Sequence, residues 1–269
     1  MSDITNSIYN LSLLDELARK ESPVHRLHPL VKLLTTVAYL TVVVSFDRYE
    51  IAGLLAYVFY PVIIFALAEL PFIPIVKRIL LVGPLIIGIG ILNPLFDNHT
   101  VVLGSIAVSR GWVAFFSIFI KGGLTVTAGV LLIATTGIDK LAAALRMLKV
   151  PRIFVLQLLL TYRYIYVLTE EVSRMVRAYS LRAPGQKGIH HDSWGSFLGQ
   201  LLLRTFERAE RVYESMILRG FSGEYGIGMN KKAGYRDFAF LMGWSAFFVI
   251  VRIYDIPALL GELFTGVII

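Results

Sequence analysis

Two arginines occupy equivalent positions in a short pattern that the sequence contains twice. The copies are Leu181-Arg182-Ala183 and Leu218-Arg219-Gly220. Each copy ends a run of residues compatible with a helix and lies next to a proline or glycine. A planar guanidinium can donate several hydrogen bonds at once to carboxylates or carbonyls. The repeat therefore predicts two equivalent anchoring points for a partner protein, and ordinary solvated charges at helix ends are the alternative interpretation.

Two long amphipathic helices must position these arginines. From Pro151 to Arg182, apolar residues recur every three or four positions, which is the spacing of one helix face. After a loop, a second stripe begins at Ser193, the expected N-cap, and ends at Gly220, the expected helix stop. A straight helix from Ser193 to Arg219 would be roughly 39 Å long, so we expect the two arginines to lie more than about 25 Å apart.

The composition is that of a membrane protein, because 56% of the 269 residues are hydrophobic and only 17% are charged. The predicted fold class is an all-α membrane protein with about five transmembrane helices and a cytoplasmic domain of long amphipathic helices. Residues 100–109 have two β-prone stretches around a Gly-Ser pair, which predicts a small extracellular β-hairpin. Five stretches are long and apolar enough to cross a hydrocarbon core of roughly 30 Å: residues 29–46, 51–68, 76–96, 112–136 and 237–255.

The distribution of basic residues predicts the orientation. If residues 1–28, 69–78 and 137–236 lie on one side of the membrane with Lys32, that side holds 22 of the 26 lysines and arginines. The positive-inside rule makes this side cytoplasmic, with the N-terminus inside and the C-terminus outside. The predicted order is a cytoplasmic N-terminal segment (1–28), four transmembrane helices (29–136), a cytoplasmic domain of long helices (137–236), and a last transmembrane helix with a short extracellular tail (237–269).

Other residue types give no catalytic, cofactor or metal site. The sequence has no cysteine, and it lacks the G-x-x-x-x-G-K-[ST] motif that binds ATP. His190 and His191 have no cluster of ligands around them, so a solvated loop is the better interpretation. His28-Pro29 is better explained as a turn and a helix start. The sequence leaves open whether Lys121 is a charge buried deep in a span or lies near the lipid headgroups.

Three stretches are specific enough to compare with a known family: "SPVHRLHPLVKLL" (22–34), "LKVPRIFVLQLLLTYRYI" (148–165) and "RTFERAERVYESMILRGFSG" (204–223). With them, the chain resembles over nearly its whole length the T component of energy-coupling-factor transporters, and it is closest to the cobalt-type (CbiQ) branch. In that family, two Ala-Arg-Gly-type tripeptides end two cytoplasmic coupling helices, and each arginine docks in a groove on one subunit of an ATPase dimer. Here both arginines are kept, neither tripeptide has the leading alanine, and the first also lacks the glycine.

The resemblance implies a four-part importer in the cytoplasmic (inner) membrane of a prokaryote. Two ATP-binding-cassette subunits would bind and hydrolyse ATP, and a membrane-embedded S component would bind a transition metal ion, cobalt before nickel. This chain would be a non-catalytic subunit, surrounded by lipid and without a nucleic-acid partner, that transmits motion through residues 181–183 and 218–220. The alternatives are a T component serving a vitamin-type S component and a secondary transporter, which usually shows internal repeats with buried ionisable residues in discontinuous spans.

Overall fold

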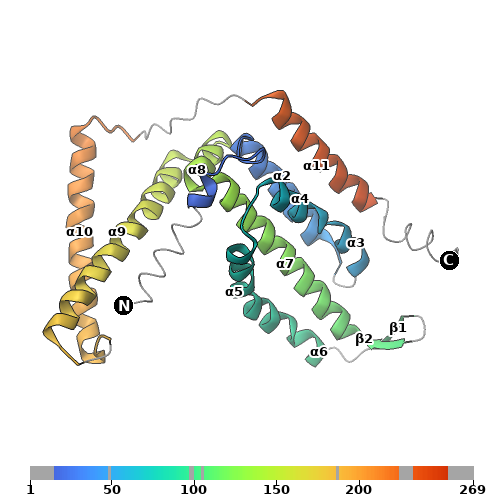
Figure 1. The fold of residues 1–269 in the computed structure, drawn as a ribbon, viewed down its shortest axis with the longest axis horizontal. Coiled ribbons are helices and arrows are strands. Elements are labelled where there is room, and N and C mark those ends of the chain that lie inside the picture. The colour runs from blue at the N-terminus through green and yellow to red at the C-terminus, as the bar shows by residue number, and fades with distance from the viewer. Residues whose placement is uncertain are drawn as a thin grey trace. The chain divides into compact units, whose positions relative to one another are not determined.

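The structure is a computed structural model that describes residues 15–47, 50–96, 100–103, 106–185, 188–223 and 233–253, with the backbone alone for Ala52 and residues 100–108. The described residues are nearly all helical (Figure 1). The elements are α2 (Pro29–Ser45), α3 (Ile51–Ala56), α4 (Phe59–Leu67), α5 (Phe72–Gly90), α6 (Leu92–Phe96), β1 (Thr100–Leu103), β2 (Ile106–Ser109), α7 (Arg110–Thr136), α8 (Ile138–Met147), α9 (Arg152–Arg182), the 3₁₀ turn η1 (His191–Ser193), α10 (Trp194–Leu218) and α11 (Tyr235–Ile253).

The chain divides into two compact units. The core unit comprises residues 15–137 and 230–269, and it contains α2 to α7 and α11. The long-helix unit comprises residues 138–229 with residues 1–14, and it contains α8, α9 and α10. β1 and β2 belong to the core unit and pair as an antiparallel hairpin, from Thr100 opposite Ser109 to Leu103 opposite Ile106.

Three of the described helical stretches are long and apolar enough to cross a membrane: Phe72–Phe96, Arg110–Thr136 and Arg152–Arg182. Pro29–Ser45 and Gly53–Leu67 are shorter apolar helices. The sequence analysis places α9 in the cytoplasmic domain. The helix is nevertheless long and apolar enough to cross a membrane, because its first half is apolar. The expected fifth span corresponds to α11, which has 19 residues. Helix α11 is not one of the three membrane-length stretches, because it carries charges at both ends: Arg236, Asp237 and Arg252.

The N-terminal end of α2 is fixed by a histidine and a buried carboxylate. His28 is the N-cap, and its Nδ1 accepts a hydrogen bond of 3.3 Å from the Leu30 amide, while Pro29 takes the first helical position. The His28 amide donates to Asp237 Oδ1 at 2.6 Å, and the Gly234 amide donates to Asp237 Oδ2 at 2.8 Å. The predicted helix start at His28-Pro29 is confirmed, and Asp237 joins the beginnings of α2 and α11.

Two lysines connect α2 and α7 reciprocally. Lys32 of α2 is buried, and its Nζ donates to the backbone carbonyl of Thr135 near the end of α7 at 2.7 Å. Lys121 of α7 donates to the carbonyls of Phe46, at 2.6 Å, and Asp47, at 3.0 Å, just beyond the end of α2. The last carbonyls of a helix lack intrahelical partners and form the negative end of its dipole. Lys121 is therefore a helix-capping charge.

The second expected span, residues 51–68, is interrupted by a turn at Tyr57 and Val58 that separates α3 from α4. Pro61 explains the break, because proline has no amide hydrogen to donate to the carbonyl four residues earlier, which is that of Tyr57. The buried Tyr39 hydroxyl donates to this carbonyl at 3.1 Å. Tyr57 in turn donates to the carbonyl of Phe248 in α11 at 2.8 Å. The Tyr39 hydroxyl thus takes the place of the amide donor that Pro61 lacks. It does so inside a cluster of aromatic rings that includes Tyr57 and Phe248.

Candidate functional site

The two predicted arginines belong to a pair of long helices that run in opposite directions within the long-helix unit (Figure 1). Tyr179, near the end of α9, joins that end to the beginning of α10. Its hydroxyl accepts a hydrogen bond of 3.3 Å from the His190 amide and lies 3.5 Å from Ser193 Oγ. Arg182 follows Tyr179 by one helical turn, so it lies at the N-terminal end of α10.

Arg219 lies at the opposite end of α10. The helix is continuous over its 25 residues, which corresponds to a length of about 37 Å at 1.5 Å per residue. The structure therefore separates Arg182 from Arg219 by the length of this helix. The arrangement excludes a single site made by both arginines and presents one arginine at each end of α10.

An ion-pair cluster holds α9 and α10 together between these ends. Glu171 of α9 accepts a hydrogen bond from Arg204 of α10, and Arg174 lies 3.5 Å from the other carboxylate oxygen of Glu171. The hydrogen bond from Arg204 lowers the pKa of the Glu171 carboxyl below its ordinary value, with help from the charges of Arg174 and Arg208. Sequence reasoning missed this cluster because no local pattern relates residues 33 positions apart.

Both arginines and the leucines before them are exposed. Leu181 is 82% exposed and Leu218 is 88% exposed, which places them among the most exposed large apolar residues described. Arg182 and Arg219 are also exposed, and neither forms an ion pair with any residue within the described ranges. An exposed apolar side chain next to an exposed guanidinium is suited to a partner groove that offers apolar contact and hydrogen-bond acceptors.

The two copies of the pattern end their helices differently. At the end of α10, Gly220 has φ +79°, the Phe221 amide donates to the Met216 carbonyl, and the Gly220 amide donates to the Ile217 carbonyl, both at 2.9 Å. This is a Schellman cap, and glycine adopts its left-handed position without strain. The predicted helix stop at Gly220 is therefore confirmed.

The end of α9 lacks that cap. Ala183 has φ −123° and ψ 67°, and its amide still donates to the carbonyl of Tyr179, four residues earlier, at 3.0 Å. The first positive φ after α9 is that of Gly185, with φ +95°. An alanine resists the left-handed conformation, so the chain leaves α9 without a left-handed residue at this position. Arg182 is consequently the last residue of its helix, whereas Arg219 is the C-cap residue of α10.

The other polar residues weighed from the sequence have structural contacts. His190 Nδ1 lies 3.2 Å from Asp192, and no group of three or more metal-ligating side chains occurs among the described residues. His25 is buried, with Nδ1 2.7 Å from Ser22 Oγ and Nε2 3.0 Å from the carbonyl of Leu17. Ser193 stands at the N-cap position of α10 as expected, but its side chain makes no capping hydrogen bond, because Oγ turns toward Tyr179 instead.

The membrane-length helices and a match to a known protein family together define the class of protein: a membrane component of a transport system. Residues 20–227 match the model of the family CbiQ, cobalt transport protein. This match covers most of the chain, and the chain belongs to the CbiQ family. The resemblance found from the sequence is thus confirmed at the level of the family.

Curated relatives share part of this sequence. The uncharacterized protein MJ1571 of Methanocaldococcus jannaschii is 27% identical over 188 residues, which cover 65% of this chain and 64% of the relative. The nickel permease LarQ of Lactiplantibacillus plantarum is 26% identical over 104 residues, covering 39% of this chain and 38% of LarQ. The uncharacterized protein MJ1089 of M. jannaschii is 33% identical over 92 residues, 34% of each chain. The matches thus span less than two thirds of each relative.

Proposed function

We propose that the protein is the transmembrane coupling (T) subunit of an ATP-driven energy-coupling-factor importer of a transition metal ion, cobalt first and nickel next. Membership of the cobalt transport family and the likeness to a nickel permease support transport of such an ion. The observation that carries the coupling role is the placement of two exposed Leu-Arg pairs at opposite ends of α10. The partners are two ATP-binding-cassette subunits, which bind ATP, and a membrane-embedded S component, which binds the metal.

Each arginine anchors one ATPase subunit. The guanidinium groups of Arg182 and Arg219 donate charge-assisted hydrogen bonds to carboxylates or carbonyls in a groove. Leu181 and Leu218 add apolar contact beside them. Because the two anchors act together as a bivalent attachment, the loss of one weakens association and the loss of both removes it. The Glu171 ion pairs keep α9 and α10 together, so the helices move as one body when the ATPases close on ATP.

The long-helix unit is cytoplasmic in this proposal, and the core unit is embedded in the membrane. The asymmetry of lysine and arginine supports this orientation, with the N-terminus inside and the C-terminus outside. The second half of α9 carries Glu170, Glu171, Arg174, Arg177 and Arg182, which supports a cytoplasmic position for that half even though the helix as a whole is long enough to span. Motion of the ATPases would pass along α9 and α10 to the core unit and reorient the S component.

Co-purification and metal uptake test the proposal. The Arg182→Ala/Arg219→Ala double variant should lose both ATPase chains and uptake while remaining in the membrane. Arg177→Ala/Arg211→Ala is the matched control, because it removes one exposed arginine from each of the same helices and leaves the Glu171 ion pairs intact; Arg211 pairs within α10 with Glu207. Normal assembly and uptake by the first double variant would show that the helix-end arginines are ordinary surface charges and would refute the coupling role.

A further inference from the structure

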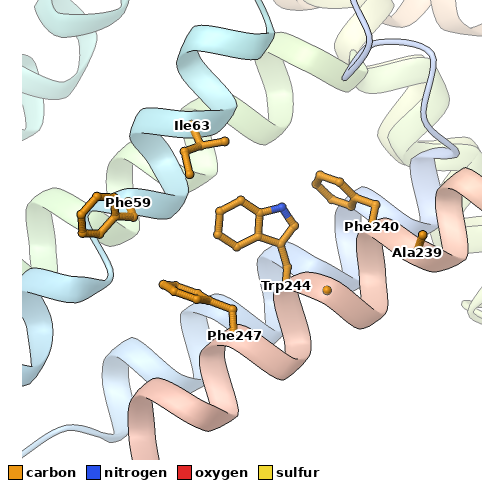
Figure 2. A pocket seen from close by; sticks show the side chains of 7 residues that line it. Phe59, Ile63, Ala239, Phe240, Trp244 and Phe247 are labelled. Carbon is orange, nitrogen blue, oxygen red and sulfur yellow. The ribbon is translucent and has the colours of Figure 1, made fainter. Parts of the chain in front are cut away.

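A groove with aromatic walls lies between α4 and α11 in the core unit. Its volume is about 480 Å³, and it is lined by Phe59 and Ile63 of α4 and by Phe240, Trp244 and Phe247 of α11. Figure 2 shows Trp244 lying between the two helices, with Phe240 and Phe247 on either side of it along α11. Tyr60 of α4 packs edge to face against Trp244, with the ring centroids 4.8 Å apart.

A second hollow of about 910 Å³ adjoins this groove at the beginning of α11. Phe240 lines both spaces, and the second one also includes Leu67, Arg236 and Asp237. Along α4, Phe59 and Ile63 lead to Leu67 at intervals of four residues, so all three lie on one helix face. Along α11, Phe247, Trp244 and Phe240 lead to Arg236 at intervals of three or four residues, so they too lie on one helix face. The two hollows therefore meet at Phe240, and together they make a groove that is apolar from Phe247 to Phe240 and lined by charged residues beyond it.

The length of this groove corresponds to one leaflet of a bilayer. From Arg236 to Phe247 the axis of α11 rises by about 16 Å at 1.5 Å per residue. Half of a hydrocarbon core of roughly 30 Å is about 15 Å. With Arg236 at the level of the headgroups, the aromatic part of the groove thus reaches the middle of the membrane. Tyr235, which is 86% exposed, lies beside Arg236 at the level where aromatic residues favour the interface.

The charges at the end of the groove favour a phosphate. Four charged side chains line this end, and three of them are engaged. Arg26 donates to Glu21 at 3.1 Å, and the buried Asp237 carboxylate accepts from the amides of His28 and Gly234. Arg236 is exposed and has no ion pair among the described residues. Its guanidinium is therefore available to an anionic group at the membrane surface.

We propose that this groove binds one membrane phospholipid, with its phosphate at Arg236 and an acyl chain along Phe240, Trp244 and Phe247. A phospholipid joins a charged group to a long apolar chain. The groove offers the same two surroundings in the same order, a charged end followed by an apolar length. A partner helix would require apolar or small contacts along the whole groove, and Arg236 would lie against it without a role. The lipid would fill the space between α4 and α11 in the core unit.

Native mass spectrometry of the full chain in detergent tests the proposal with two lipids of equal acyl chains, phosphatidylglycerol and a phosphate-free galactosyl diacylglycerol. The protein should retain one phosphatidylglycerol in preference to the glycolipid. Arg236→Gln should reduce that preference about fivefold, which corresponds to roughly 1 kcal/mol for one basic residue at a membrane surface. Arg177→Gln, which removes an exposed arginine of α9, should leave the preference unchanged.

Gly243→Leu tests the apolar part of the groove. Gly243 lines the groove, and a Cβ at this position would meet no atom within 4 Å, so leucine fills the space without displacing the protein. Retention of both lipids should fall to the background level. Gly88→Leu, an equally open position on α5, is the matched control and should retain lipid normally. Unchanged retention in both Arg236→Gln and Gly243→Leu would overturn the proposal.

A photocrosslinking residue in place of Phe240 distinguishes a lipid from a partner helix. In native membranes the crosslinked product should carry the mass of a phospholipid, whereas a product carrying a protein would assign the groove to a partner and overturn the proposal. Both measurements detect bound lipid directly and neither depends on metal uptake. The lipid site can therefore be refuted, or supported, independently of the coupling function.

Discussion

Lys32 of α2 donates a 2.7 Å hydrogen bond to the backbone carbonyl of Thr135, which lies 103 residues later at the end of α7. At the other end of α2, Lys121 of α7 makes the corresponding contact with the carbonyls of Phe46 and Asp47. Each helix thus supplies a cation to the carboxyl end of the other. In a membrane, where unsatisfied carbonyls and unpaired charges are both costly, this exchange satisfies both groups at once. It also fixes the register of α2 against α7.

We expect Lys32→Met to destabilise the core unit, because methionine preserves the length of the side chain and removes its donor and charge. A hydrogen bond that involves a charged group contributes about 1.5–3 kcal/mol, and a lysine buried to this degree has few alternative contacts with water. The thermal midpoint of the purified protein in detergent measures the effect. Lys77→Met on an exposed position of α5 is the control. Equal midpoints for the two variants would contradict a capping role for Lys32.

The orientation can be tested by labelling single cysteines in this cysteine-free chain. A cysteine at Ser222, just beyond α10, should react with a membrane-impermeant maleimide only after the cells are opened, because the proposed orientation places the long-helix unit in the cytoplasm. Reaction in intact cells would reverse the orientation. A cysteine at Ser109, the last residue of β2, should react in intact cells and is the control for reagent access.

Replacing the two helix-end arginines with lysine should rescue coupling only in part. Lysine preserves the charge, but it lacks the planar fork that satisfies two acceptors at once. Arg182→Lys/Arg219→Lys should therefore retain more ATPase than the double alanine variant and less than the unmodified protein. The fraction of ATPase retained during a salt wash measures this order. Equal retention by the lysine and unmodified proteins would mean that charge alone is recognised.

The contact between Glu171 and Arg204 predicts a pH dependence for the α9–α10 pair. Because Arg204 lowers the pKa of the Glu171 carboxyl, the ion pair contributes stability at pH values above the ordinary glutamate pKa, and this contribution is lost as the pH falls through the lowered pKa. The pair is partly solvated, so the contribution is about 0.5 kcal/mol. The distance distribution between spin labels on α9 and α10 should stay constant from neutral to weakly acidic pH and broaden only in stronger acid. Glu171→Gln should abolish this change, and the same broadening in that variant would assign it to another group.

How well the sequence predicts a feature of this structure depends on how far apart along the chain the interacting residues are. The stripes of α9 and α10 and the cap at Gly220 follow from residues three to five positions apart, so they could be predicted. The helix α5 begins at Phe72, four residues before the predicted span 76–96, and Pro74 lies in its first turn, where a helix tolerates proline. The contacts of Lys32 and Glu171 join residues far apart in sequence, so only the tertiary structure reveals them.

The difference between the two helix ends leads to the last prediction. Gly220 adopts a left-handed conformation with φ +79°, so Gly220→Ala should destabilise the end of α10 by about 1 kcal/mol and displace Arg219 from its position. Ala183 has φ −123°, so Ala183→Gly should have a much smaller effect on the end of α9. To measure ATPase binding at one helix end alone, each substitution is combined with alanine in place of the arginine at the other helix end. In the Arg182→Ala background, Gly220→Ala should weaken ATPase retention further, whereas in the Arg219→Ala background, Ala183→Gly should leave it nearly unchanged. If Gly220→Ala is as mild as Ala183→Gly, the cap of α10 does not position Arg219, and the arginine binds its partner from a flexible helix end.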